Sequence, residues 1–196
     1  MSQALDDRSL DQLFRTARTY NGFNAAPLPA DTAERLYELI KWGPTSMNGQ
    51  PGRFVFITSE EGKQRLLPAL SPGNVEKTLA APMTVIVAYD TRFFEHLPRH
   101  FSAYDARPMF ESNAALAEST AFRNSSLQGA YLMMAARSLG LSVGAMSGFD
   151  PAKVNEAFFP DGRYKVNFLC NIGVGDDTKV YPRASRFDFD EIAEVI

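Results

Sequence analysis

The spacing of apolar and polar residues predicts helices and strands along the first half of the chain. Apolar residues recur at helical intervals over 5–14 and again over 36–40, so two helices precede the first strand. An apolar run at 54–58 predicts that strand. The run at 83–89 is β-branched and almost wholly apolar, which indicates a central strand covered on both faces.

The second half of the chain contains a long predicted helix and two further strands. Residues 114–139 form a helical pattern whose second half is apolar nearly all round, so this helix must be buried in the domain or against a partner. Strands are predicted at 141–146 and 164–174, and a short amphipathic helix at 187–196. Residues 92–110 show no sustained period, which is typical of a lid or binding loop. Few strands separated by helices favour an α+β layered domain.

Local signals mark three shorter helices. Ser59 is the expected cap of one of them. Residues 71–74 read as a turn, after which a helix over 75–79 ends before Pro82. Asp150 is the expected cap of another helix, whose first residue is the following proline.

Composition narrows the class of protein. The 196 residues are 45% apolar and 22% charged, which fits one domain spanning 1–196. A net charge of −3 provides no basic field for nucleic acid. No leader pattern and no apolar stretch of membrane-spanning length is found, so we expect a cytoplasmic protein without a membrane partner. Cys170 is the single cysteine, which excludes an intrachain disulfide and favours a buried packing role.

Several familiar sites fail on their spacing. Residues 144–148 place the serine one position away from a hydrolase elbow, and a turn is the better interpretation. Residues 173–175 lack the third glycine of a dinucleotide fingerprint. His96 and His100 have a helical metal spacing, but Pro98 between them is expected to disrupt the helix. No metal site is therefore predicted.

The segment from Pro44 to Pro51 is the strongest candidate for a binding site. It lies between a helical run and a strand, and it contains small polar side chains, an amide pair and two prolines. Asn48 and Gln50 each offer a donor and an acceptor, which the pyrimidine edge of a flavin requires. An ordinary surface loop is the alternative interpretation.

Basic and amide residues elsewhere could complete a site for a flat ligand that carries phosphate. Such a ligand requires guanidinium or ammonium groups with hydroxyl or amide donors. The alternative is that each residue is a solvated surface group. The candidates are Arg18, Thr19, Asn21, Asn74, Lys77, Arg183 and Arg186.

Five segments together carry a resemblance to a known family. They are 17–22, 41–48, 122–126, 146–150 and 171–176. The combination of Pro-Thr-Ser-x-Asn in the second segment with Arg-Asn-Ser-Ser in the third is specific. On these residues the chain resembles the FMN-dependent nitroreductases, in particular the branch that includes malonic semialdehyde reductase.

The resemblance implies a homodimer with interlocked termini and a central mixed, mainly antiparallel sheet flanked by helices. It also implies one FMN at each of two subunit interfaces, with NADH or NADPH as transient hydride donor. By position, the family's segment for phosphate and flavin is matched by Arg18, Thr19 and Asn21, and the residues at the pyrimidine end of the ring are matched by Asn74 and Lys77. The loop that the partner subunit delivers is matched by Pro44, Thr45, Ser46 and Asn48. The contact beside flavin N5 is matched by Ser147 and Gly148, and the C-terminal basic pair by Arg183 and Arg186.

The expected activity is a ping-pong reduction in which NAD(P)H and the acceptor use the same flavin face in turn. The resemblance suggests malonic semialdehyde, reduced to 3-hydroxypropanoate, as acceptor. Arg107 or Arg123 could hold its carboxylate. A broad nitroreductase or quinone reductase, and a flavin-binding protein without turnover, are the alternatives. The choice between NADH and NADPH stays open.

Overall fold

A four-stranded sheet organises the computed structural model, which describes residues 3–196. The strands are β1 (Gly52–Ile57), β2 (Met83–Asp90), β3 (Ser142–Met146) and β4 (Tyr164–Gly173), in the order β1-β2-β4-β3. Every pairing within this sheet is antiparallel. A parallel contact occurs as an isolated bridge between Thr19 and Val143 at the β3 edge. The predicted α+β class is confirmed.

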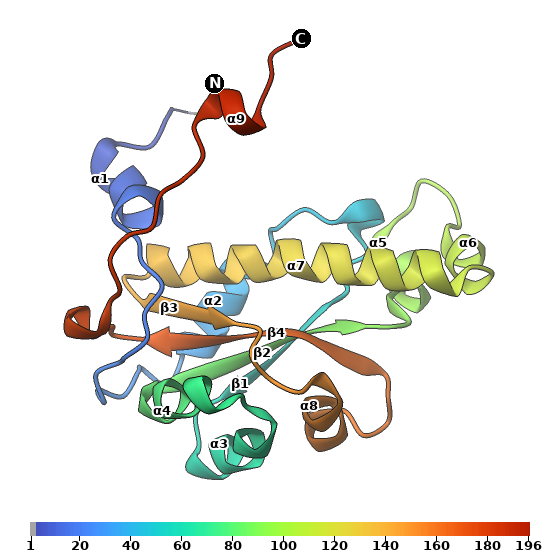
Figure 1. Ribbon diagram of the computed structural model, residues 1–196. Coiled ribbons are helices and arrows are strands. Elements are labelled where there is room, and N and C mark those ends of the chain that lie inside the picture. Colours follow the sequence, from blue (N-terminus) through green and yellow to red (C-terminus); the bar gives the residue numbers. More distant parts are fainter. Residues whose placement is uncertain (1–2) are drawn as a thin grey trace.

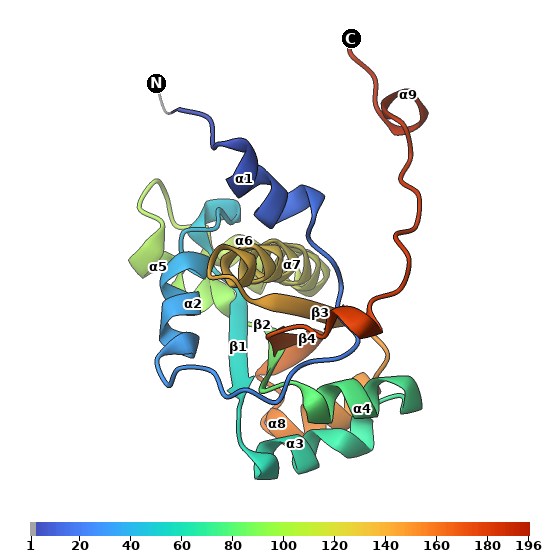
Figure 2. The ribbon, with the colours of Figure 1, turned by 90° about the vertical axis from the view of Figure 1, so that its left-hand side faces the viewer.

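Helices cover both faces of the sheet. The long α7 and α2 lie on one face, and α3, α4 and α8 lie on the other (Figure 1, Figure 2). The helices are α1 (Asp7–Leu10), α2 (Thr32–Ile40), α3 (Glu60–Leu66), α4 (Pro72–Ala80), α5 (Leu97–His100), α6 (Arg107–Glu111), α7 (Ala114–Ser138), α8 (Pro151–Phe158) and α9 (Phe189–Ile192).

Strand β2 supplies alternate side chains to two separate cores. Val85 and Val87 pack with residues of α2 and α7. Ile86 and Ala88 point the other way, toward residues of α3 and α8. Because successive side chains of a strand face opposite sides, a strand covered on both faces is expected to be apolar at nearly every position. This arrangement explains the almost wholly apolar run from which β2 was predicted.

The prediction of a turn at residues 71–74 is wrong. Pro72 opens α4, so these residues belong to the first helical turn. Proline is well tolerated there because the first backbone N–H groups of a helix have no intrahelical partner. The same reasoning corrects Pro98, which lies in the first turn of α5 and does not disrupt it. Residues 144–146 form part of β3 and are not a turn.

The predicted C-terminal helix over 187–196 shrinks to a single turn, α9. Phe187, Phe189 and Ile192 are exposed, so the apolar side of this segment has no surface of its own chain to pack on. A short amphipathic helix without tertiary packing is marginal in water. Both end segments extend away from the layered body on the same side (Figure 1, Figure 2).

Residues 92–110 form short helices around a buried aromatic cluster. Phe93, Phe94 and Phe110 are all buried and pack with Ala121 of α7. The aromatic residues therefore serve as core here. Cys170 is fully buried, as expected for a packing residue, and burial raises the pKa of its thiol to about 12. No helix of residues 3–196 is both long and apolar enough to cross a membrane.

Candidate cofactor site

A cavity of about 710 Å³ lies between the N-terminal and C-terminal segments. It is lined from one side by residues 14–21 and from the other by residues 181–186, with Lys77 of α4 and Ala145 of β3 between them. The structure thus brings together residues that are far apart in the sequence. Predicted cofactor residues that line this cavity are Arg18, Thr19, Asn21, Lys77, Arg183 and Arg186.

The cavity is strongly cationic. Within residues 3–196 no carboxylate lines it, and only one of its arginines, Arg15, forms ion pairs, with Asp7 and Asp11. The other basic residues of the lining make no ion pair among the described residues; they are Arg18, Lys77, Arg137, Arg183 and Arg186. Cations without counter-charges around one cavity favour an anionic ligand, and guanidinium groups suit phosphate in particular.

Two arginines join the segments that form the cavity walls. Arg18 donates to the backbone carbonyl of Tyr181, and Arg183 donates to that of Ala17 at 3.0 Å. Each guanidinium has further N–H donors beyond the one used in this contact. The C-terminal segment is therefore held against the N-terminal segment by residues that also line the cavity.

Lys77 and Asn21 form a polar pair at the cavity wall. The Lys77 ammonium donates to Asn21 Oδ1 at 3.3 Å. Burial lowers the pKa of Lys77 below its usual value because the charged form loses hydration. An ammonium group held in a partly buried wall can stabilise negative charge that develops on a ligand.

Asn74 lies one helical turn before Lys77 and contacts the loop after β3. Its Nδ2 donates to the carbonyl of Gly148 at 2.7 Å. A Cβ at Gly148 would come within 2.6 Å of that nitrogen, so only glycine allows this approach. Ser147 precedes it and is exposed. Through α4, the predicted residues Ser147 and Gly148 are thus adjacent to the Lys77 end of the cavity.

Arg137 in the last turn of α7 was missed by the sequence analysis. It lines the cavity, and its Nε is buried without a hydrogen-bond partner. Nη1 donates to the carbonyl of Leu13 at 3.0 Å. Burial lowers the pKa of this guanidinium, and no carboxylate compensates for the burial. A lone charge in the otherwise apolar second half of α7 was the available signal.

The predicted loop residues Pro44, Thr45, Ser46 and Asn48 do not line this cavity. They lie near the middle of α7, where the backbone N–H of Ser46 donates to Asn124 at 2.8 Å. Asn124 and Arg137 are separated by roughly 20 Å along the helix at 1.5 Å per residue. A single chain therefore holds the two halves of the predicted site apart. That the partner subunit supplies the loop stays a prediction.

The candidate acceptor residues also lie outside the cavity. Arg107 pairs with Glu111 on α6 at 3.4 Å, and Arg123 is exposed on α7. Neither lines the cavity within one chain, so their role stays a prediction. Residues 3–196 contain no cluster of three or more metal-ligating side chains.

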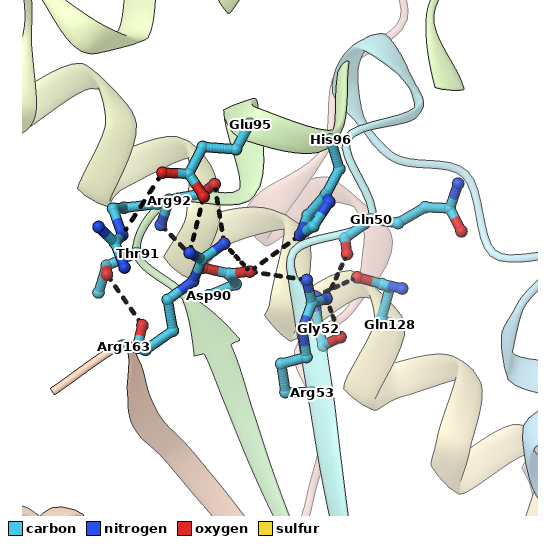
Figure 3. Close-up of polar contacts among 10 residues, drawn as sticks. All are labelled: Gln50, Gly52, Arg53, Asp90, Thr91, Arg92, Glu95, His96, Gln128 and Arg163. Carbon is cyan, nitrogen blue, oxygen red and sulfur yellow. Dashed lines mark hydrogen bonds and ion pairs between the residues drawn. The ribbon is translucent and has the colours of Figure 1, made fainter. Parts of the chain in front are cut away.

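A buried ion network supports the C-terminal end of the loop between α2 and β1 (Figure 3). Asp90 is fully buried at the end of β2 and pairs with Arg53 and Arg163 at 2.7 Å each. Arg53 also donates to the carbonyls of Gln50 and Gly52 at 2.9 Å. The network thus connects the centre of the sheet to the backbone of the loop.

The site of this α+β fold is thus a cationic cavity, with an amide and an ammonium group paired at its wall and guanidinium groups nearby. A sequence profile described as "Nitroreductase family" matches residues 15–175. The chain belongs to the nitroreductase family, and it is an oxidoreductase of that family.

Curated relatives cover the chain from end to end. A "Putative NADH dehydrogenase/NAD(P)H nitroreductase" of Stenotrophomonas maltophilia is 55% identical over 100% of both chains. A protein with the same description from Burkholderia lata is 57% identical over 97% of this chain and 98% of its own.

Solved structures share the fold at low sequence identity. A nitroreductase family protein of Streptococcus pneumoniae has a TM-score of 0.84 and 21% identity, covering 95% of this chain and 100% of its own. A "putative nitroreductase in complex with FMN" from Exiguobacterium sibiricum has a TM-score of 0.83 and 22% identity over 100% of both chains.

Proposed function

We propose that this protein is an FMN-dependent oxidoreductase that takes electrons from NADH or NADPH and reduces a small aldehyde acid such as malonic semialdehyde. The observation that carries the proposal is the cavity with five basic side chains that lack counter-charges, one of which, Lys77, donates to Asn21. Family membership and the FMN complex of the Exiguobacterium protein support the cofactor.

The residues present fit FMN chemically. The guanidinium groups of Arg18, Arg183 and Arg186 are suited to a phosphate dianion. Arg137 adds a buried N–H without a partner. FMN held there would supply two-electron redox chemistry between NAD(P)H and the acceptor. Lys77 would stabilise negative charge on the reduced ring, because its ammonium lies in a partly buried wall.

The site is completed in a homodimer. Residues 44–48 of one subunit supply the loop for the cofactor of the other, since within one chain they lie near Asn124 and away from the cavity. The exposed Phe187, Phe189 and Ile192 of the C-terminal segment provide apolar area for contact with that partner.

Reconstitution with FMN tests the proposal. Protein purified in the presence of FMN is expected to elute as a yellow dimer with one flavin per subunit, and NADH or NADPH should bleach it without any acceptor. When the concentrations of the nicotinamide and of the acceptor are both varied, double-reciprocal plots of the initial rate should give parallel lines. Colourless monomeric protein would refute the proposal, and yellow protein that no nicotinamide bleaches would favour a flavin-binding protein without turnover.

The acceptor requires a separate test. We propose that Arg107 or Arg123 of one subunit holds the carboxylate of the aldehyde acid at the other subunit's flavin. Alanine at the correct position should raise the KM for malonic semialdehyde and leave that for a neutral quinone almost unchanged. Equal losses on both acceptors would exclude this role. A broad nitroreductase or quinone reductase is the second candidate, favoured by the descriptions of the Stenotrophomonas and Burkholderia relatives.

A further inference from the structure

The loop between α2 and β1 has an unusual backbone. Met47, Asn48 and Gln50 have φ angles of 52°, 48° and 43°, in the left-handed region that non-glycine residues seldom adopt. Such conformations persist only where the surroundings over-determine them, and they cluster at functional sites. The neighbouring contacts should therefore show what maintains the strained backbone.

Helix α7 holds the loop at both ends through two buried amides. Asn124 Oδ1 accepts from the backbone N–H of Ser46 at 2.8 Å. Gln128 Oε1 accepts from that of Gly52 at 2.7 Å. The two side chains are one helical turn apart, so they point from the same face of α7. Asn124 is itself fixed, because its Nδ2 donates to the Thr120 carbonyl at 2.8 Å.

The ion network around Asp90 holds the C-terminal end of this loop, next to Gly52, from the side of the sheet (Figure 3). Arg53 Nη1 donates to the carbonyls of Gln50 and Gly52, and the Asp90 backbone N–H donates to the carbonyl of Pro51 at 2.9 Å. Figure 3 shows Gln128 and Arg53 converging on Gly52. The backbone after the strained residues is thus fixed from two elements.

We propose that Asn124 and Gln128 are positioning residues that hold the loop in its left-handed conformation, so that Thr45, Ser46 and Asn48 reach the partner's flavin in a fixed geometry. The inference rests on the proposed function. It gives a role to the Asn of the Arg-Asn-Ser-Ser segment, which lines no part of the cavity. Neither side chain needs to touch the cofactor for this role.

Paired variants separate positioning from general stability. Gln128→Met and Asn124→Leu keep the approximate size of the side chain but remove the acceptor. Gln128→Glu retains an acceptor oxygen for the same N–H and is the rescue variant, whereas aspartate at position 124 would lose the bond to the Thr120 carbonyl and is not used. Ser126→Ala is the control. Ser126 accepts from Asn167 on β4 and donates to the Phe122 carbonyl on α7, so this variant removes hydrogen bonds that do not involve the loop.

The first measurement is amide hydrogen exchange in protein without flavin. We expect exchange of the Gly52 N–H to rise on the order of tenfold in Gln128→Met, and that of Ser46 in Asn124→Leu, as for loss of one buried hydrogen bond. Gln128→Glu, which retains the acceptor, should keep the Gly52 amide protected. Unchanged exchange in Gln128→Met and Asn124→Leu would overturn the inference without bearing on the proposed function.

The second measurement is the FMN dissociation constant, with the visible flavin spectrum and the melting temperature of flavin-free protein. We expect roughly tenfold weaker binding and a shifted spectrum in Gln128→Met and Asn124→Leu, and recovery in Gln128→Glu. Weaker binding that tracks the melting temperature across all variants, Ser126→Ala included, would mean a purely structural role and overturn the inference. Failure of the unmodified protein to bind FMN would instead refute the proposed function.

Discussion

The guanidinium of Arg163 binds both oxygens of the buried Asp90 carboxylate, with Nε 2.7 Å from Oδ1 and Nη2 3.1 Å from Oδ2. Burial alone would raise the pKa of Asp90. The bonds from Arg163 and from the Arg92 backbone N–H, with the charge of Arg53, outweigh burial and lower the pKa below its usual value. The charged carboxylate is therefore the form that the fold stabilises.

Replacing Asp90 by Asn should destabilise the protein in a pH-dependent way. The variant leaves Arg53 without a carboxylate partner and Arg163 with Glu95 alone, and removing one partner of a buried pair typically costs about 3–5 kcal/mol. Because the pKa is lowered in the folded state, the stabilisation is complete above the unfolded value near 3.8 and is lost as pH falls through the folded value. Urea unfolding should show a gap between the two proteins that narrows below pH 4.

A surface ion pair provides the control for this prediction. Glu111→Gln removes the exposed partner of Arg107 and should change the free energy of unfolding by less than about 1 kcal/mol. A gap between Asp90→Asn and the unmodified protein that is constant from pH 7 to pH 3 would contradict the linkage. The carboxylate would then act through packing alone.

Lys77 should make flavin binding sensitive to alkaline pH. Its pKa is lowered by burial, so it loses its proton below the usual value of 10.5. We expect FMN affinity to fall as pH rises through that lowered pKa, because the neutral amine no longer attracts the flavin. Lys77→Arg stays charged and should bind FMN with a flatter pH profile, while Lys77→Met should bind weakly throughout.

Titration of FMN fluorescence from pH 7 to pH 10 would compare these three proteins. Any titration of the flavin itself is common to all of them, so the difference between Lys77 and Lys77→Arg isolates the side chain. Parallel profiles for these two would show that Lys77 does not face the cofactor.

Gly148 should tolerate no side chain. A Cβ there would lie 2.6 Å from Asn74 Nδ2 and break the bond between Asn74 and the Gly148 carbonyl. Gly148→Ala is expected to weaken FMN binding about tenfold or more, as for loss of a buried hydrogen bond with local displacement. The matched control is Gly73→Ala in α4, where nothing lies within 4 Å of the added Cβ and affinity should be unchanged. Equal affinities for both variants would remove Gly148 from the site.

The sequence predicted the elements whose pattern is complete within one segment. Strand β2 is almost wholly apolar because both faces are covered, and α7 is long and continuous, so both were predicted close to their bounds. The sequence also predicted that Arg18, Lys77 and Arg183 belong to one site, and the structure places all three around one cavity.

The features that the sequence could not predict depend on partners distant in the chain. Arg137 is significant because its Nε is buried beside a cavity, which spacing alone does not reveal. The left-handed Met47 is equally hidden, because methionine is not a residue that signals positive φ. The prediction of a helix over 187–196 was too long, because amphipathic spacing does not show whether a surface is present for the helix to pack against.

Trp42 should report assembly of the proposed dimer. It is the single tryptophan, and its side chain is 75% exposed at the end of α2, directly before the loop that the partner is proposed to receive. Tyr131 and Leu127 of α7 are also exposed, and Gly43 lies against the Tyr131 ring. An apolar surface of this kind is typical of an interface between subunits.

Quenching of Trp42 fluorescence by acrylamide tests this interface. We expect weak quenching in the dimer and strong quenching after dilution to monomer. Trp42→Ala should raise the dimer dissociation constant. Strong quenching at concentrations where the mass is that of a dimer would place the interface elsewhere.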